Sequence, residues 1–181
     1  MRLIILRLHF IIMSDQIGFK PVFDGVVRDY IRPLAEMLYP EHISGEDAEE
    51  NYAFIVDYQK DPEDVLDEKD FDIDLKEHRD SSVATLNVCL GYDNFTGGNV
   101  SFRADEPGGF GQNSKGTGEI AMTPGVAMLH KGQHRHAALP ITNGRRVNLI
   151  IWLMGKGGYV RVMPYKSVEE QLTGRDRWGR I

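Results

Sequence analysis

Residues 76–91 read "KEHRDSSVATLNVCLG", and this stretch holds both a candidate metal-binding pair and a predicted β-strand. From residue 82 onward polar and apolar residues alternate, which is the pattern of a strand with one buried face. His78 and Asp80 come just before the strand, two residues apart. On an extended segment such side chains project to the same face and can bind one metal ion together. The stretch therefore predicts a metal site whose third ligand lies elsewhere in the chain.

The same letters allow a second interpretation, because the catalytic loop of protein kinases also begins His-Arg-Asp. That loop carries an Asn five residues after its Asp, where this chain has Thr85, and no Asp-Phe-Gly follows. A chain of 181 residues is also short for a kinase domain. The metal interpretation is therefore preferred.

Length and composition indicate one globular domain, since 41% of the residues are hydrophobic and 27% are charged. The formal net charge of −6 argues against nucleic acid or an anionic membrane surface as the main partner, because either favours a basic face. The single cysteine, Cys89, excludes an intramolecular disulfide and a cysteine-rich zinc site. We expect an intracellular location, such as the cytoplasm.

Residues 1–12 form an apolar run that we interpret as an N-terminal extension without a role in the chemistry. The run is interrupted by Arg7 and His9 and lacks a small-residue cleavage site. It is also shorter than the roughly 20 residues that a membrane-spanning helix needs, so we expect no stable membrane insertion. Residues 13–181 are assigned to one domain with its core at about 53–164.

The remaining pattern is a helical lead-in followed by short strands. Apolar residues in 23–42 have helical spacing, with Pro33 starting a second helix or kinking the first. Seven or eight strands with glycine and proline turns are predicted at 52–58, 82–91, 98–103, 119–124, 126–132, 136–141, 145–153 and 159–164. Ser167 and Glu170 have capping-box spacing, so a short closing helix is expected. The sequence thus predicts a mainly β fold, a jelly roll (double-stranded β-helix) with N-terminal supporting helices.

Candidates for the third ligand crowd into "LHKGQHRHAALP", which contains His130, His134 and His136. Two histidines and one carboxylate form the facial triad of non-haem iron(II) oxygenases, which leaves positions for a cosubstrate and oxygen. Such enzymes often hold 2-oxoglutarate, whose distal carboxylate pairs well with the two parallel N–H groups of an arginine. A hairpin expected around an Asn-Gly turn at 143–144 places either Arg145 or Arg146 on its inner face. Spacing alone leaves the choice of histidine and of arginine open.

Taken together, these motifs resemble the 2-oxoglutarate and Fe(II)-dependent oxygenases, in their prolyl and lysyl hydroxylase-like branch. The resemblance covers about residues 53–153 and follows, in order, "FIVDY", "HRD", "TLNVCL", "FTGG", "GVAMLH", "HAALPITNGRR" and "VNLIIW". It implies that His78, Asp80 and His136 bind iron. It also implies that Arg146, ten residues after His136, binds the C5 carboxylate of 2-oxoglutarate.

The resemblance assigns further positions around this set. Tyr58 and Asn87 match family positions that hydrogen-bond 2-oxoglutarate. His130 and His134 exceed the triad, so we expect them beside the site or at its mouth.

The implied activity is hydroxylation of a C–H bond, with Fe(II), 2-oxoglutarate and O2 as cofactors and release of succinate and CO2. Ascorbate is an optional further ligand. The implied substrate is a peptide or protein side chain, or a small molecule. An acidic segment, residues 61–77, has nine Asp or Glu against two lysines and is expected to border the entrance, where it would attract a basic peptide.

Two other classes of function fit the same fold. One is a cupin-like metal enzyme or isomerase that does not use 2-oxoglutarate. The other is a catalytically silent jelly-roll binding module. Binding of 2-oxoglutarate separates the first from an oxygenase, and an intact ligand set argues against the second.

Overall fold

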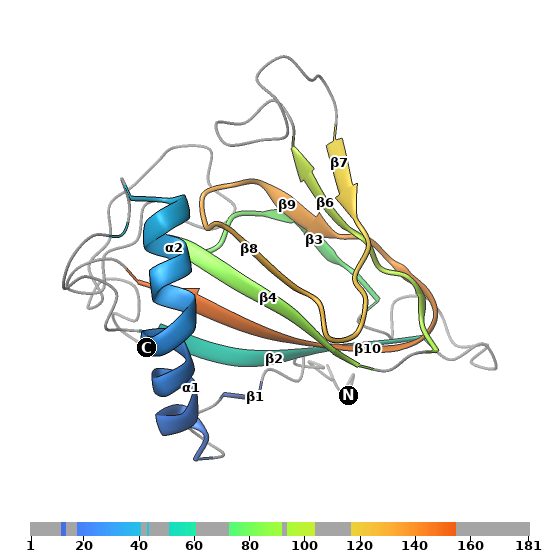
Figure 1. Cartoon of the computed structure of the whole chain (residues 1–181). Helices are drawn as coiled ribbons and strands as arrows, with labels where there is room; N and C mark the ends of the chain where they lie inside the picture. The colour runs from blue at the N-terminus through green and yellow to red at the C-terminus, as the bar shows by residue number, and fades with distance from the viewer. Residues whose placement is uncertain are drawn as a thin grey trace, which may run out of the picture.

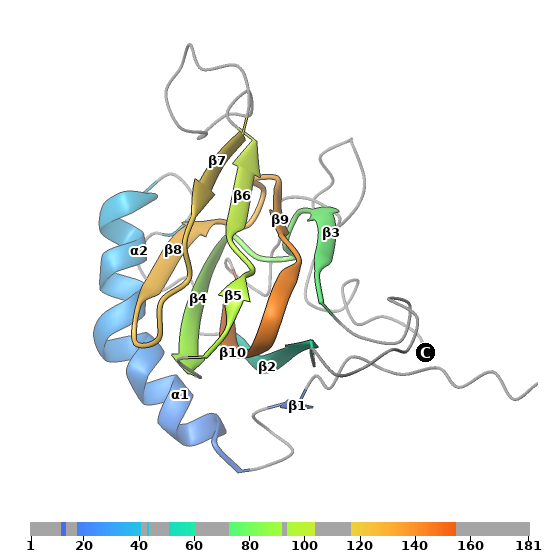
Figure 2. The same ribbon diagram turned by 90° about the vertical axis from the view of Figure 1, so that its right-hand side faces the viewer.

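The computed structural model describes residues 12–13, 18–40, 43, 51–60, 73–91, 94–103 and 117–154. Within these residues two antiparallel sheets face each other, and a helical segment lies along the outer side of the larger sheet (Figure 1; Figure 2). This arrangement confirms the predicted jelly roll, or double-stranded β-helix, with its N-terminal supporting helices.

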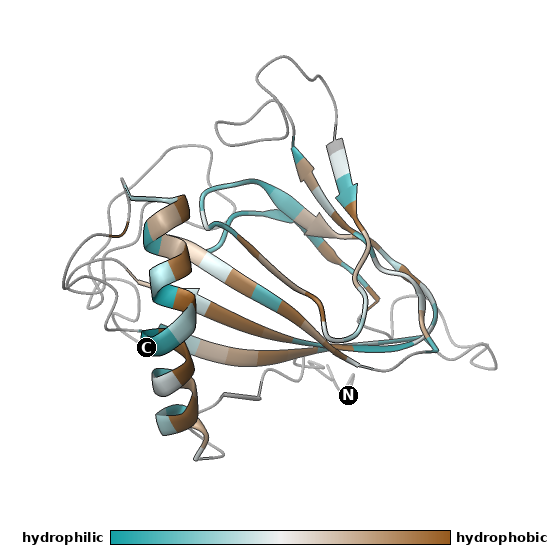
Figure 3. Ribbon diagram, in the orientation of Figure 1, coloured by the Kyte–Doolittle hydropathy of each residue, from teal (hydrophilic) through white to brown (hydrophobic). Residues whose placement is uncertain are grey.

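The larger sheet has the strand order β1-β2-β10-β4-β8, with β5 paired to β10. These strands are β1 (Ile12–Met13), β2 (Asn51–Lys60), β4 (Ala84–Gly91), β5 (Thr96–Gly97), β8 (Ala127–Lys131) and β10 (Ile141–Leu153). The smaller sheet has the order β3-β9-β6-β7, formed by β3 (Leu75–His78), β6 (Val100–Arg103), β7 (Thr117–Ile120) and β9 (His136–Ala138). Figure 3 shows hydrophobic and hydrophilic residues alternating along β4, as expected for a strand with two different faces.

The helical segment consists of α1 (Lys20–Val26), a π-helical turn η2 (Val27–Ile31) and α2 (Arg32–Leu38). Pro33 lies in the first turn of α2, directly after η2. The predicted second helix therefore starts at this proline, but the backbone stays helical through Ile31 and Arg32, so the helical run is not broken there. In the described part of the chain no helix is both long and apolar enough to span a bilayer.

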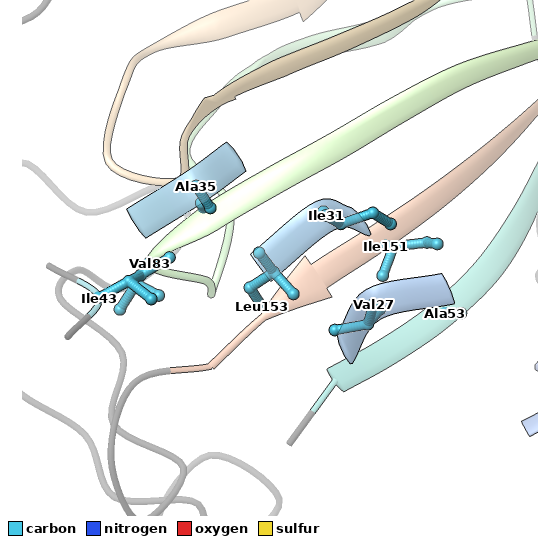
Figure 4. Close-up of a cluster of buried hydrophobic side chains, with 9 residues drawn as sticks. Val27, Ile31, Ala35, Ile43, Ala53, Val83, Ile151 and Leu153 are labelled. Atoms are coloured by element: carbon cyan, nitrogen blue, oxygen red, sulfur yellow. The ribbon is translucent and has the colours of Figure 1, made fainter. Parts of the chain in front are cut away.

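One line of residues on this helical segment packs against the larger sheet. Val27, Ile31 and Ala35 are buried against Ile151 and Leu153 of β10 (Figure 4). Replacing a buried isoleucine or leucine of this contact, such as Ile31, with alanine lowers the free energy of unfolding by about 2–5 kcal/mol. The contact therefore holds the helices on the sheet. The outer side of the same segment exposes large apolar side chains, including Tyr30 at 69% and Met37 at 70%.

The structure corrects the expected hairpin at Asn143-Gly144. β10 runs as one continuous strand from Ile141 to Leu153, so these two residues do not reverse the chain. Gly144 has φ +79°, and a Cβ added there would lie 2.3 Å from the carbonyl oxygen of Asn94. The glycine therefore permits a close approach of two backbone segments. Asn-Gly is also typical of hairpin turns, which is why the sequence pattern predicted one here.

Strands β1 and β3 were not among the sequence-predicted strands, whereas the others match predicted strands or lie next to them. Several expectations fall outside the described residues. These are the extension at residues 1–12 apart from Ile12, which lies in β1, the acidic segment up to residue 72, the strand at 159–164 and the closing helix from residue 167.

Candidate metal centre

The three predicted metal ligands come together between the two sheets. His78 ends β3 and His136 begins β9, and the two are direct cross-strand partners. Asp80 follows in the loop that leads into β4. One ligand atom from each of the three side chains lies within 4.8 Å of the other two, and all three residues are buried.

Backbone carbonyls orient both imidazole rings. Nδ1 of His78 lies 2.7 Å from the carbonyl oxygen of Lys76, and Nδ1 of His136 lies 2.9 Å from that of His134. Because a carbonyl oxygen only accepts hydrogen bonds, the ring proton belongs on Nδ1 and the lone pair stays on Nε2. Both Nε2 atoms face Oδ1 of Asp80, at 3.4 Å for His78 and 3.7 Å for His136. Both rings thus have their Nδ1 fixed by a backbone carbonyl and their Nε2 lone pair available, as metal-ligating histidines do.

These separations fit a shared ion. Two ligand atoms at right angles, each about 2.1 Å from one metal ion, lie about 3.0 Å apart. The two histidine–aspartate separations of 3.4 and 3.7 Å exceed that spacing by about 0.4 and 0.7 Å. Two imidazole nitrogens and one carboxylate oxygen are the donor set of non-haem iron(II) centres, so the residues present fit Fe(II).

The electrostatics of the cluster favour a cation. Burial by itself disfavours the carboxylate, but the neighbouring histidines, His136 first, hold the pKa of Asp80 well below its usual range. Burial likewise works against charging His78, yet the adjacent carboxylate of Asp80 raises the pKa of this histidine above its ordinary value. Burial lowers the pKa of His136. An ionised carboxylate is therefore buried among imidazole rings, where a divalent ion compensates its charge.

A buried guanidinium lies at another part of the same interior. Arg146 on β10 is 1% exposed, faces Tyr58 across the strand pair, and stacks 4.4 Å from the centre of the tyrosine ring. It donates to the carbonyl oxygen of Gly98, while its Nε has no partner. No carboxylate in the described part of the chain pairs with it, and burial lowers its pKa. A buried cation without a counter-ion is costly, so this arginine fits a carboxylate ligand.

The neighbouring arginine differs in its surroundings. Arg145 forms an ion pair with Asp57, with Nη2 2.6 Å from the carboxylate oxygen Oδ2, at the surface. Next to Arg146, a Cβ added to Gly98 would lie 2.8 Å from the guanidinium nitrogen Nη1, at φ +70°. A side chain at position 98 would therefore displace the arginine.

A cavity of about 320 Å³ connects the two regions. Its lining includes all six residues singled out from the sequence, namely Tyr58, His78, Asp80, Asn87, His136 and Arg146. The rest of the wall is mostly apolar and includes Phe54, Val56, Leu75, Val100, Ala138, Ile150 and Trp152.

Sequence reasoning missed two polar side chains that hold predicted site residues in place. Thr85 donates to Oδ2 of Asp80 over 2.6 Å, and Asn148 donates to Oδ1 of Asn87 over 2.6 Å. Strand parity is the signal that could have found them. Thr85 shares the inward face of β4 with Asn87, and Asn148 shares that of β10 with Arg146.

The two extra histidines have different positions. His130 lines the cavity, is 5% exposed, and places its unpartnered Nε2 3.8 Å from Oδ2 of Asp80. Burial, with His136 nearby, lowers the pKa of His130 to about 3, so this ring is neutral at physiological pH. His134 instead places its Nε2 3.0 Å from the carbonyl oxygen of Arg103, away from the triad.

Comparison with known sequences gives consistent relatives, although no family model matches the chain. It is 37% identical over 147 residues to the 2-oxoglutarate and iron-dependent oxygenase domain-containing protein ICU11 of Arabidopsis thaliana, covering 80% of this chain and 34% of that protein. It is 36% identical over 145 residues to the 2-oxoglutarate and iron-dependent oxygenase domain-containing protein 2 of Xenopus tropicalis, covering 78% of this chain and 37% of that protein. It is 30% identical over 146 residues to human procollagen-lysine,2-oxoglutarate 5-dioxygenase 1, covering 75% of this chain and 16% of that protein.

The match thus spans about a third of the first two relatives and a smaller part of the third. None of these names mentions ascorbate, so ascorbate binding stays a prediction. Among solved structures, a 2OG-Fe(II) oxygenase family oxidoreductase from Burkholderia pseudomallei superposes with a TM-score of 0.41 at 17% identity, covering 56% of this chain and 41% of that one. A cupin domain from Bordetella pertussis superposes with a TM-score of 0.36 at 14% identity, covering 61% of this chain and 85% of that one. On the evidence of its sequence relatives, the chain belongs to the 2-oxoglutarate and iron-dependent oxygenase superfamily.

Proposed function

We propose that this domain is a 2-oxoglutarate- and Fe(II)-dependent dioxygenase that hydroxylates a C–H bond of a peptide or protein side chain, with release of succinate and CO2. The observation that carries the proposal is one cavity lined both by the buried donor set and by a buried guanidinium without a carboxylate partner in the described part of the chain. A cupin-like metal enzyme or isomerase has no use for that guanidinium. A silent binding module has no reason to keep all three donors.

The side chains have separate tasks in this proposal. Nε2 of His78, Nε2 of His136 and Oδ1 of Asp80 hold the iron, because these are the atoms that face one another. Arg146 binds the distal carboxylate of 2-oxoglutarate with its planar fork. When bound, iron and 2-oxoglutarate together supply the activation of O2 and the oxidising power for the C–H bond.

Asn87 contributes a hydrogen-bond donor of fixed orientation. Its Oδ1 already accepts from Asn148, so its amide N–H groups remain to donate toward the cavity that Asn87 lines. Phe54 and Trp152 form an edge-to-face pair, 5.2 Å between ring centres, that provides an apolar wall. Such a wall keeps water from the reacting atoms.

Two observations support a peptide or protein substrate. Relatives of this chain include proteins named as procollagen lysine hydroxylases. In addition, the acidic segment at 61–77 leads directly to His78, and its negative field favours a peptide rich in lysine or arginine. A proline- or lysine-containing peptide with flanking basic residues is therefore the first substrate to test.

The experiment measures succinate formed from 2-oxoglutarate with Fe(II) and O2, in the presence of such peptides and of small metabolites. Mass spectrometry then looks for one added oxygen on the compound that stimulates succinate formation. Asp80→Ala serves as the control without a complete donor set. If the parent protein binds no 2-oxoglutarate and forms no more succinate than Asp80→Ala, the proposed function is wrong. Stimulation by a small metabolite alone would leave the reaction intact and refute the peptide substrate.

A further inference from the structure

The two oxygens of the Asp80 carboxylate have different surroundings. Oδ1 faces Nε2 of His78 and of His136, as described above. Oδ2 instead accepts a hydrogen bond from the hydroxyl of Thr85, 2.6 Å away, and lies 3.8 Å from Nε2 of His130. One oxygen is therefore turned to the donor cluster and the other toward β4 and β8.

His130 does not supply a hydrogen bond to Oδ2. Its Nε2 is 3.8 Å from Oδ2, beyond hydrogen-bond distance, and has no partner, while its Nδ1 lies 3.0 Å from the carbonyl oxygen of Lys131. Thr85 and His130 are direct partners across the β4–β8 pair and flank Oδ2 together. Of these two, Thr85 is the one that donates to Oδ2.

The hydroxyl of Thr85 is itself in contact with a second hydroxyl, that of Ser82. Oγ of Ser82 lies 2.7 Å from Oγ1 of Thr85, and both residues are buried, with Thr85 1% exposed. Because the hydrogen of Thr85 goes to the carboxylate, its oxygen accepts the hydrogen of Ser82. The two hydroxyls form a short chain that ends on Asp80, and such chains polarise each member.

The backbone of Asp80 is held separately from its carboxylate. Its N–H donates to the carbonyl oxygen of Gly132 over 2.8 Å. A Cβ added to Gly132 would lie 2.0 Å from the carbonyl oxygen of Ser82, so glycine allows the two loops to meet there. This contact fixes where Asp80 sits but not the rotation of its carboxylate, which is a broad torsion in aspartate.

We propose that Thr85, supported by Ser82, is a positioning residue that sets this rotation, holding Oδ1 of Asp80 toward the metal position and Oδ2 away from it. The inference rests on the proposed function, because it needs a metal at the triad. Ligation through one carboxylate oxygen keeps the other metal positions open for the cosubstrate and oxygen. Thr85 acts only through Asp80 and is not itself a metal ligand.

The test measures metal affinity rather than turnover. Metal-free protein is titrated with Co(II), and the visible absorption of the bound ion gives both the dissociation constant and the shape of the ligand field. Thr85→Val keeps the side-chain size and removes the hydroxyl, so we expect the dissociation constant to rise about 10- to 100-fold, with an altered spectrum. Thr85→Ser retains the hydroxyl and should recover most of the affinity and the parent spectrum.

Thr142→Val is the matched control, since its exposed hydroxyl pairs with Thr96 over 2.8 Å, apart from the donor cluster. Thermal unfolding of every metal-free variant shows whether the fold is retained. Thr85→Val with parent affinity and spectrum would overturn the inference while the proposed function stands. Equal loss in Thr85→Val and Thr85→Ser, with a lowered unfolding temperature, would also overturn it, because the role would then be packing. A parent protein that binds Co(II) no better than Asp80→Ala would refute the proposed function and this inference together.

Discussion

Replacing Arg146 with lysine tests the cosubstrate site while leaving a positive charge in the cavity. Arg146 is fully buried and stacked on Tyr58, with one guanidinium nitrogen on the carbonyl oxygen of Gly98 and Nε without a partner. A lysine ammonium cannot form the two parallel hydrogen bonds that a guanidinium gives to a carboxylate. We therefore expect Arg146→Lys to lose about one charged hydrogen bond to 2-oxoglutarate.

The size of the effect follows from that loss. A hydrogen bond to a charged group contributes about 1.5–3 kcal/mol. At about 1.4 kcal/mol per tenfold change, the dissociation constant of 2-oxoglutarate should rise about 10- to 150-fold. Metal affinity should stay within about twofold of the parent value, because Arg146 does not belong to the donor cluster.

Isothermal titration of 2-oxoglutarate into protein loaded with Mn(II) measures this affinity without turnover. Arg145→Lys is the matched control, because Arg145 pairs with Asp57 at the surface and such pairs contribute only about 0–1 kcal/mol. We expect the control to bind 2-oxoglutarate as the parent does. A larger loss in Arg145→Lys than in Arg146→Lys, or parent affinity in Arg146→Lys, would refute the assignment of the cosubstrate site.

Three further variants test the rest of the site. Asp80→Ala should abolish Fe(II)-dependent succinate formation and weaken metal binding while the fold is retained, and full activity in this variant would refute the triad. His136→Ala should remove activity whereas His134→Ala should only reduce it, because Nε2 of His134 is directed to a backbone carbonyl and not to Asp80. Equal losses in the two variants would contradict the assignment of His136 as the metal ligand. Asn148→Leu should free the amide of Asn87 and weaken 2-oxoglutarate binding about 2- to 12-fold, the equivalent of one neutral hydrogen bond, with unchanged metal affinity. Unchanged calorimetric affinity would show that Asn87 needs no orientation by Asn148.

Local patterns in the sequence were enough for the fold class and for much of the candidate site. Alternation of polar and apolar residues indicated the strands, and the two-residue spacing of His78 and Asp80 placed both on one face, because side-chain direction within an extended segment depends only on parity. The resemblance then singled out His136 and Arg146. All four residues line the same cavity in the structure.

Turn chemistry shows where local patterns mislead. Asn143-Gly144 has the letters of a hairpin, but Gly144 serves a close approach to the backbone at Asn94, and β10 continues through it. A positive φ is required in both situations, so the sequence cannot distinguish them. Only the packing of the neighbouring segment decides which one occurs.

Tertiary structure alone decided which side chains support the site residues. Thr85 reaches Asp80 because the chain bends at residues 81–83, between β3 and β4. Asn148 reaches Asn87 because β10 and β4 are neighbours in the larger sheet. Parity gives the face of a side chain on its own strand, but the register between strands determines its partner, and that register is a property of the assembled sheet. For the same physical reason, His78 and His136, 58 residues apart in sequence, become direct partners only when β3 pairs with β9.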